Sequence, residues 1–192
     1  VSYVRLAFDV RDIPEEKLPH LGLLKNVLGL VNTQNYSYGD LFNEMNLKTG
    51  GITFQTGTYS HAENLDEFRF MFEIKGKAFE NQTDELIRLI SEIFFTSELT
   101  DEKRLKEILG ELKSRMQARM TSAGHSLAVM RAASYITLAA WADDQMGGVS
   151  FYRFISELLS DFENKKEECM AGLRETLEFI SHKGRLLYDY TG

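Results

Sequence analysis

The 192-residue chain has the size of one large domain, and 43% of its residues are hydrophobic, which is enough to build a core. Its formal net charge of −7, with basic and acidic residues mixed throughout, excludes a nucleic-acid surface, because binding phosphate needs clustered Lys and Arg. No apolar run approaches the roughly 20 residues that span a bilayer, so no membrane partner is expected, and the single cysteine, Cys169, excludes an internal disulfide and favours a reducing, cytoplasmic compartment.

The first part of the chain predicts a strand followed by two helices. Apolar and polar residues alternate over 2–10 with the period of two that indicates a strand with one buried face. A helix is predicted over 14–31, because Pro14 and the acidic residues after it suit a first helical turn and apolar residues continue from there. A second helix is predicted from 37 or 38 to 47, and the glycine pair 50–51 ends it.

The clearest strand pair spans 52–59 and 68–74, with a polar connection over 60–67. In the second of these strands four apolar residues alternate with more polar ones. The edge at 52–59 offers one functional alternative, because an exposed sheet edge can add an extended peptide as an extra strand.

Helical spacing dominates the rest of the chain. Apolar residues three and four apart predict amphipathic helices around 86–94 and 105–116. The Ala- and Ser-rich segment 124–141 is predicted to be the central helix, because small side chains let neighbouring helices approach closely. Ser150 is expected to cap the next helix, and a closing strand is predicted over 186–190.

Strands followed by a block of helices predict an α+β fold, an antiparallel-rich sheet covered on one side by helices. No repeat or low-complexity linker interrupts the sequence, so we expect a single domain over 1–192. The chain begins inside a strand and without an initiator Met. We therefore expect it to be a fragment of a larger multidomain protein.

Three segments in this order resemble the pitrilysin/insulinase-type zinc metallopeptidase domain: the helix-like run 18–28, the stretch Tyr36-Ser37-Tyr38-Gly39-Asp40, and the glycine pair 50–51 before a strand. In that family the first helix carries H-x-x-E-H, two imidazoles that hold Zn²⁺ with a Glu between them as general base. The matching stretch here reads Gly22-Leu23-Leu24-Lys25-Asn26, and His20 is the only histidine in the first 60 residues. The resemblance is closest to the non-catalytic third domain, the peptidase-associated region, of the presequence-protease branch.

The resemblance implies a metallopeptidase-like domain that lacks the zinc site. It assigns no catalytic residue and no metal ligand to this chain, leaves the substrate-binding residues unknown, and places the zinc in the catalytic domain of a parent endopeptidase that degrades unstructured peptides. The chain would then have no activity alone and would wall the substrate chamber. Its partners would be other domains of the same polypeptide and, indirectly, the peptide. The alternative is a stand-alone, inactive peptidase-like protein that serves in binding or assembly.

The histidines offer little for a metal site. His61 and Glu63 lie close together in the connection between the two strands, but a metal needs at least three converging ligands. If the chain were an independent metalloenzyme, its metal would need one distant histidine as a ligand in addition to His61 and Glu63. His20, His125 and His182 have no ligand three or four residues further along the chain, so we expect them to be solvated or to cap helices.

The remaining candidates have structural interpretations. Glu102, Glu107 and Glu111 occupy the region where active members of the family carry a third zinc ligand, but their spacing also suits the charged outer face of a helix, and without the two histidines we interpret them so. Cys169 falls in phase with the apolar residues of the last helix. Because a catalytic thiol needs a base and an electropositive setting, we interpret Cys169 as a buried structural residue.

Overall fold

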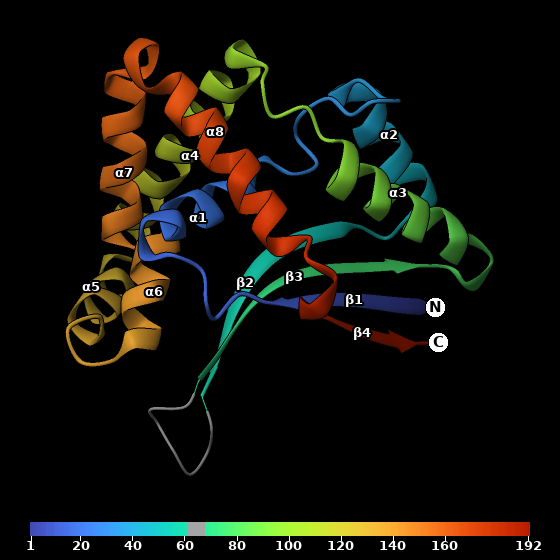
Figure 1. Cartoon of the computed structure of the whole chain (residues 1–192), viewed down its shortest axis with the longest axis horizontal. Helices are drawn as coiled ribbons and strands as arrows, with labels where there is room; N and C mark the ends of the chain where they lie inside the picture. Colours follow the sequence, from blue (N-terminus) through green and yellow to red (C-terminus); the bar gives the residue numbers. More distant parts are fainter. Residues whose placement is uncertain (61–67) are drawn as a thin grey trace.

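The computed structural model describes residues 1–60 and 68–192 and has the predicted α+β architecture. Its strands are β1 (Ser2–Asp9), β2 (Ile52–Ser60), β3 (Phe68–Ala78) and β4 (Leu186–Thr191). They form one antiparallel sheet in the order β2-β3-β1-β4. Because β1 pairs with β4, the N- and C-terminal residues meet at the same end of the sheet (Figure 1).

Helices cover one face of this sheet, as the sequence predicted (Figure 1). In chain order they are α1 (Leu18–Val27), α2 (Tyr38–Lys48), α3 (Thr83–Thr96), α4 (Glu102–Ser122), α5 (Gly124–Ala133), α6 (Leu138–Gly147), α7 (Val149–Ser160) and α8 (Phe162–Ile180), with short 3-10 turns at η1 (Glu15–Lys17), η2 (Glu80–Gln82) and η3 (Lys183–Arg185). Helices α2 and α3 lie at one end of the sheet, and α5, α6 and α7 lie at the other. Within the described residues, no helix has both the length and the apolar character needed to cross a membrane.

The core lies between the sheet and the helices, and α1 is at its centre. Phe72 and Ile74 of β3 point into it from the sheet, and Leu21 and Leu24 of α1 are completely buried against it. Helix α1 packs against β2, α4, α6, α7 and α8. This position explains why the segment is apolar on nearly every side, because a helix surrounded by other elements has no solvent face.

The prediction of one central helix over 124–141 is wrong. The structure has two helices there, because the chain turns after α5 and Thr137 starts α6 by accepting a hydrogen bond from the backbone N–H of Ala140 (3.2 Å). Leu127 is the only residue of α5 that is buried in the described structure. Small residues predicted close packing, but on α5 they lie at the periphery of the fold (Figure 1).

Two predicted helix boundaries also differ from the structure. The helix expected over 14–31 is a 3-10 turn followed by α1, which ends at Val27 because Gly29 reverses the chain with a φ of 81°. Ser150 does not cap α7. The cap comes instead from Asp144 of the preceding helix, whose Oδ1 accepts from the Val149 N–H (2.9 Å).

The opposite face of the sheet carries no helix in the described part of the chain. One row of paired residues across this open face reads Gln55, Glu73, Ala7 and Leu187, from β2 to β4. Glu73 is nevertheless completely buried, and Met71 nearly so. Neighbouring side chains on the open face therefore cover the middle of β3.

Candidate functional site

Three positions of α1, Gly22, Lys25 and Asn26, stand where the resemblance would place the residues of a zinc-binding helix. Gly22 faces α6 so closely that an added Cβ would lie 2.7 Å from the Cα and carbonyl oxygen of Met146. Asn26 turns its amide back onto its own helix, where Nδ2 donates to the Gly22 carbonyl oxygen (2.8 Å). Gly22 therefore allows the close packing of α1 on α6, and Asn26 makes a hydrogen bond within α1.

Lys25, the remaining position, extends its amine toward β2 and α6. Its Nζ donates to Thr56 Oγ1 of β2 (3.1 Å), and a Cβ added to Gly147 at the end of α6 would lie 3.8 Å from Nζ. Burial lowers the pKa of Lys25 to about 8, the charge of Asp143 opposes this, and the charge of Arg119 adds to it. The end of α6 carries partial negative charge, which favours a cation there.

Asp143 of α6 completes this group, which we call the lysine cluster: Lys25, Thr56, Thr58 and Asp143. Thr58 Oγ1 donates to Asp143 Oδ1 (2.9 Å), which fastens α6 to β2. Burial raises the pKa of Asp143, while the hydrogen bond from Thr58 and the charge of Lys25 oppose the increase. The lysine cluster thus joins α1, β2 and α6 through two side-chain hydrogen bonds and the opposite charges of Lys25 and Asp143.

These residues do not fit a zinc ion. Glycine offers no ligand atom, the lysine is a cation at neutral pH, and the amide of Asn26 is already engaged. Over residues 1–60 and 68–192, no group of three or more His, Cys, Asp or Glu is arranged to hold a metal ion. His61 and Glu63, the pair considered from the sequence, lie outside the described residues.

The acidic residues of α4 lie on its outer face, as predicted. Glu102, Glu107 and Glu111 are all exposed. Glu102 pairs with Lys166 of α8 (2.6 Å) and Glu107 pairs with Arg104 (3.1 Å), so the observed ion pairs reach another helix or the preceding turn. Surface pairs of this kind contribute little to stability and indicate no site.

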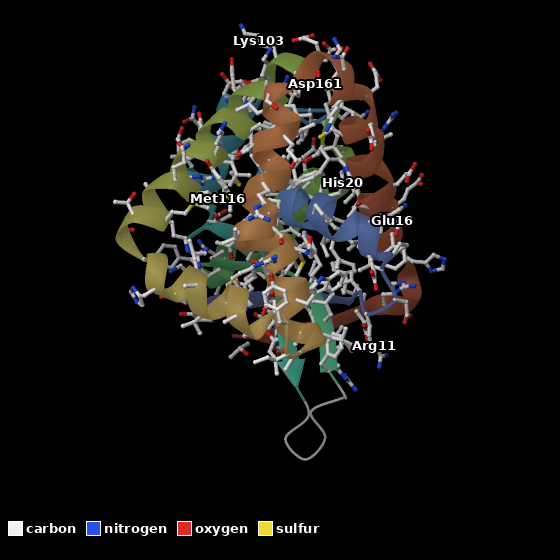
Figure 2. The ribbon with its side chains drawn as sticks, turned by 90° about the vertical axis from the view of Figure 1, so that its left-hand side faces the viewer. Arg11, Glu16, His20, Lys103, Met116 and Asp161 are labelled. Atoms are coloured by element: carbon white, nitrogen blue, oxygen red, sulfur yellow. The ribbon has the colours of Figure 1, made fainter. Side chains whose placement is uncertain are left out.

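His20 departs from the prediction of a solvated or capping residue, whereas His125 and His182 are exposed as expected. Figure 2 shows His20 on α1 where this helix passes between α7 and α8. Its ring meets Phe154 edge-on with centroids 5.3 Å apart, and burial lowers its pKa. The sequence missed this environment because the packing partners come from helices more than 130 residues further along the chain.

Cys169 lines the same 190 Å³ pocket as His20. The thiol is buried, as predicted, and burial raises its pKa to about 12. A thiol with so high a pKa is protonated at neutral pH and is a poor nucleophile. The structure therefore brings together a cysteine and a histidine that are distant in the sequence, but in a setting that favours neither thiolate formation nor acid–base chemistry.

A second polar group lies on the open face of the sheet, and we call it the Glu73 cluster: Glu73, Arg5, Gln55, Tyr59 and Lys75. Tyr59 Oη donates to Glu73 Oε1 (2.5 Å), and Arg5 pairs with the same oxygen. Gln55 Nε2 (2.8 Å) and Lys75 Nζ (2.9 Å) donate to Oε2. Burial alone would raise the pKa of Glu73, but these hydrogen bonds outweigh it and lower the pKa to about 2.

The Glu73 cluster was not singled out from the sequence. Its signal was the one carboxylate in a strand whose other charged residues are all basic, but the alternation placed Glu73 on the polar face, where an exposed residue is the ordinary expectation. Its four partners come from three different strands, and only the sheet register brings them together.

Comparison with known proteins relates the chain to much longer peptidases. The model of the associated family of M16 peptidases, subfamily C, matches residues 1–158. Protein HypA of Clostridium perfringens is 32% identical over 192 residues, which are 100% of this chain and 20% of that protein. Presequence protease 1, chloroplastic/mitochondrial, of Arabidopsis thaliana is 28% identical over 94% of this chain and 16% of its own length. The mitochondrial presequence protease of Yarrowia lipolytica is 28% identical over 93% of this chain and 18% of its own.

The chain thus spans a fifth or less of the length of these relatives. Among solved structures, a conserved protein from Enterococcus faecalis V583 superimposes with a TM-score of 0.56 at 15% identity, over 85% of this chain and 40% of that one. At this identity the likeness concerns the fold alone. The family match covers most of the chain and confirms the resemblance seen in the sequence to the associated region of the presequence-protease branch. The chain belongs to the peptidase-associated family of the M16 peptidases, subfamily C.

Proposed function

We propose that this chain is a non-catalytic domain of a longer zinc endopeptidase, in which it walls the chamber that encloses unstructured peptides. The observation that carries the proposal is the identity of Gly22, Lys25 and Asn26 on α1, at the place of a zinc-binding helix. These residues fasten α1 to α6 and β2 and hold no metal ligand set. The role of the domain is therefore positional.

The lengths of the relatives support the proposal that this chain is part of a longer polypeptide. Two of them are named presequence proteases, and each extends far beyond the region shared with this chain. In the proposal, the remaining length supplies the zinc ion, its ligands and the general base. The partners of this chain are then the other domains of the same polypeptide, and the peptide substrate meets it as a wall of the chamber.

Exposed apolar side chains support packing against other domains. At the end of the fold that contains α2 and α3, Phe42, Phe79 and Phe95 are 56%, 73% and 70% exposed. Ile136, between α5 and α6, is 81% exposed. Large exposed apolar side chains of this kind are the groups that packing against another domain would bury.

The first experiment is the mass of the native polypeptide, by immunoblot of the source cell with an antibody raised against residues 1–192. A band several times larger than the 22.0 kDa of this chain is expected. A band near 22.0 kDa would contradict the proposal and support the stand-alone binding or assembly protein.

The second experiment separates this domain from the rest of that polypeptide. The remainder is produced without residues 1–192, and the isolated chain is added back in the presence of zinc. Neither part alone is expected to hydrolyse a quenched-fluorescent unstructured peptide, and the two together are. Phe95→Asp should weaken the recovery, whereas Glu111→Lys, on the outer face of α4, should not. Full activity of the remainder alone, or zinc-dependent hydrolysis by the chain alone, would contradict the proposal.

A further inference from the structure

A pocket of about 280 Å³ opens on the face of the sheet that carries no helix in the described structure. Its floor consists of Ala7 of β1 and Met71 of β3, each only 4% exposed. Tyr59 and Leu187, from the two outer strands, stand on opposite sides of it. The hollow exists because residue 7 has a short side chain in a row whose neighbours, Glu73 and Leu187, are long.

The Glu73 cluster holds one wall of this pocket in a fixed position. Tyr59 folds back over Gly57 to reach Glu73, and a Cβ at Gly57 would lie 2.9 Å from the Tyr59 ring. Arg5 is held at the same carboxylate and also donates to Tyr59 Oη (3.0 Å). A wall held by several hydrogen bonds is preorganised, and binding to such a surface loses little conformational entropy.

Hydrogen-bond donors remain at this wall. Both hydrogen bonds that Arg5 makes to described residues come from Nη2, so Nη1 has no partner among those residues, whereas Nε is buried and out of reach of a ligand. Arg69 lines the same pocket and is exposed. A planar guanidinium is the group best matched to a carboxylate, because it offers parallel N–H donors together with a positive charge.

The local charge is opposite to that of the whole chain. The strand register places four cationic side chains on the open face and three acidic ones: Arg5, Arg69, Lys75 and Lys77 against Asp9, Glu73 and Asp189. Glu73 is ionised and neutralises one of the two cations paired with it, Arg5 and Lys75, so the face keeps one cation more than it has anions. On a chain with a formal net charge of −7, this face thus has a small positive excess, and the pocket itself is lined by two guanidinium groups, Arg5 and Arg69, and one carboxylate, Asp189.

We propose that this pocket binds the C-terminal residue of a peptide, with its carboxylate at Arg5 and Arg69 and its apolar side chain over Ala7 and Met71. A terminal residue carries a carboxylate and an apolar group on the same atom, which matches a guanidinium wall beside an apolar floor. An internal Asp or Glu would leave the floor unfilled. The volume lies near the lower end of the range of small-ligand sites, about 300 to 1,000 Å³, and so suits one residue. The inference rests on the proposed function only in taking a peptide as the ligand.

The probe is the peptide acetyl-Gly-Gly-Ala-Phe with a free carboxylate, compared with the same peptide as its C-terminal amide. Isothermal titration of the 192-residue chain is expected to show at least tenfold tighter binding of the free acid, because a charge-assisted hydrogen bond is worth about a factor of ten or more. Arg69→Gln should weaken binding of the acid about tenfold. Lys77→Gln removes the same charge from the same face of β3 outside the pocket and should change binding less than about twofold.

The proposed binding of a C-terminal residue would be contradicted by any of three results. These are equal binding of acid and amide, no binding of either, and equal effects of Arg69→Gln and Lys77→Gln. A peptide ending in Ala in place of Phe tests the floor, and it should bind more weakly. The add-back experiment described under the proposed function measures whether the domains pack together, and it does not depend on this pocket.

Restored hydrolysis without peptide binding would therefore contradict only the proposed peptide site. Peptide binding without restored hydrolysis would contradict only the proposed role in the chamber.

Discussion

The Glu73 cluster and the lysine cluster each bury a charged group against the same sheet, but the first stabilises the charged form and the second destabilises it. On the open face, Glu73 receives hydrogen bonds from four side chains and its pKa falls to about 2, so the charge is favoured despite burial. On the helix side, Lys25 makes one side-chain hydrogen bond to the residues that the structure describes, and its pKa falls to about 8, so the charge is disfavoured.

The difference shows that burial alone does not decide whether a charge is stable. Each charge loses water, but only Glu73 recovers enough partners to compensate for it. The Glu73 cluster therefore stabilises a buried charge, whereas the lysine cluster holds α1, β2 and α6 together around an amine whose charge burial disfavours. The following changes test this contrast, from the largest expected effect to the smallest.

Glu73→Ala is expected to lower the free energy of unfolding by about 2–4 kcal/mol, because it removes the buried acceptor that four donor side chains share. The figure is below the upper range for buried pairs because the Arg5 and Lys75 side chains are 37% and 42% exposed. Urea denaturation at pH 7 measures it. Glu111→Ala, on the exposed face of α4, is the control and should stay within about 0.5 kcal/mol of wild type. Equal effects of the two changes would mean that the Glu73 cluster is not stabilising.

Gly22→Ala should destabilise the protein by about 1–3 kcal/mol, because the new Cβ meets the backbone of Met146 at 2.7 Å and α6 must move away. Gly110→Ala is the matched control, since a Cβ on that glycine of α4 has no neighbour within 4 Å. It should stabilise the helix by about 0.5–1 kcal/mol. Thermal unfolding separates the two, and a stabilising Gly22→Ala would contradict the close packing of α1 on α6.

Lys25→Met should remove a dependence of the free energy of unfolding on pH in the alkaline range. The pKa of Lys25 lies near 8 in the folded chain and near its ordinary value of 10.5 in the unfolded chain. Between these values the unfolded state binds more protons, so wild-type stability relative to Lys25→Met should rise with pH, by on the order of 2 kcal/mol. Denaturation of both proteins at pH 7 and pH 10 measures the difference, and the contribution of Cys169 is common to both. A difference that stays constant with pH would contradict the burial of the amine.

Glu73 should make the stability of the protein depend on pH in the acid range. Its pKa is lower in the folded chain than in the unfolded chain, so its contribution to stability is complete above the ordinary carboxyl pKa of 4.5 and is lost as the pH falls toward 2. Wild type should therefore lose stability relative to Glu73→Gln between about pH 4.5 and pH 2. Parallel acid-unfolding curves for the two proteins would show that the carboxylate is not held by its donors.

Thr58→Val should have the smallest effect, about 0.5–1.5 kcal/mol, because it removes one hydrogen bond from Asp143 and keeps the shape of the side chain. Thr53→Val, on the exposed side of the same strand, is the control, since its hydroxyl makes only a 3.4 Å contact with the Lys75 carbonyl. Both are measured by urea denaturation. Equal effects would mean that the bond between β2 and α6 contributes nothing to stability.

Much of the fold followed from local pattern. The alternation at 2–10 and the spacing at 86–94 and 105–116 correspond to β1, α3 and α4 in the structure. Two predictions whose outcome depended on distant neighbours were wrong, the central helix over 124–141 and the solvated His20. The environment of His20 is decided by α7 and α8, whose positions a local pattern does not contain.

The sequence by itself determined the α+β class and the family resemblance, because periodicity and the order of segments are local properties of the chain. It also led to the prediction, from the resemblance, that Gly22, Lys25 and Asn26 stand at the place of a zinc-binding helix. Only the tertiary structure decided what these residues do instead and that Glu73 is buried, because both depend on contacts across the sheet register and between helices. The charge on Lys25 and on Glu73 follows from the partners that the fold supplies, and the residue type alone specifies neither.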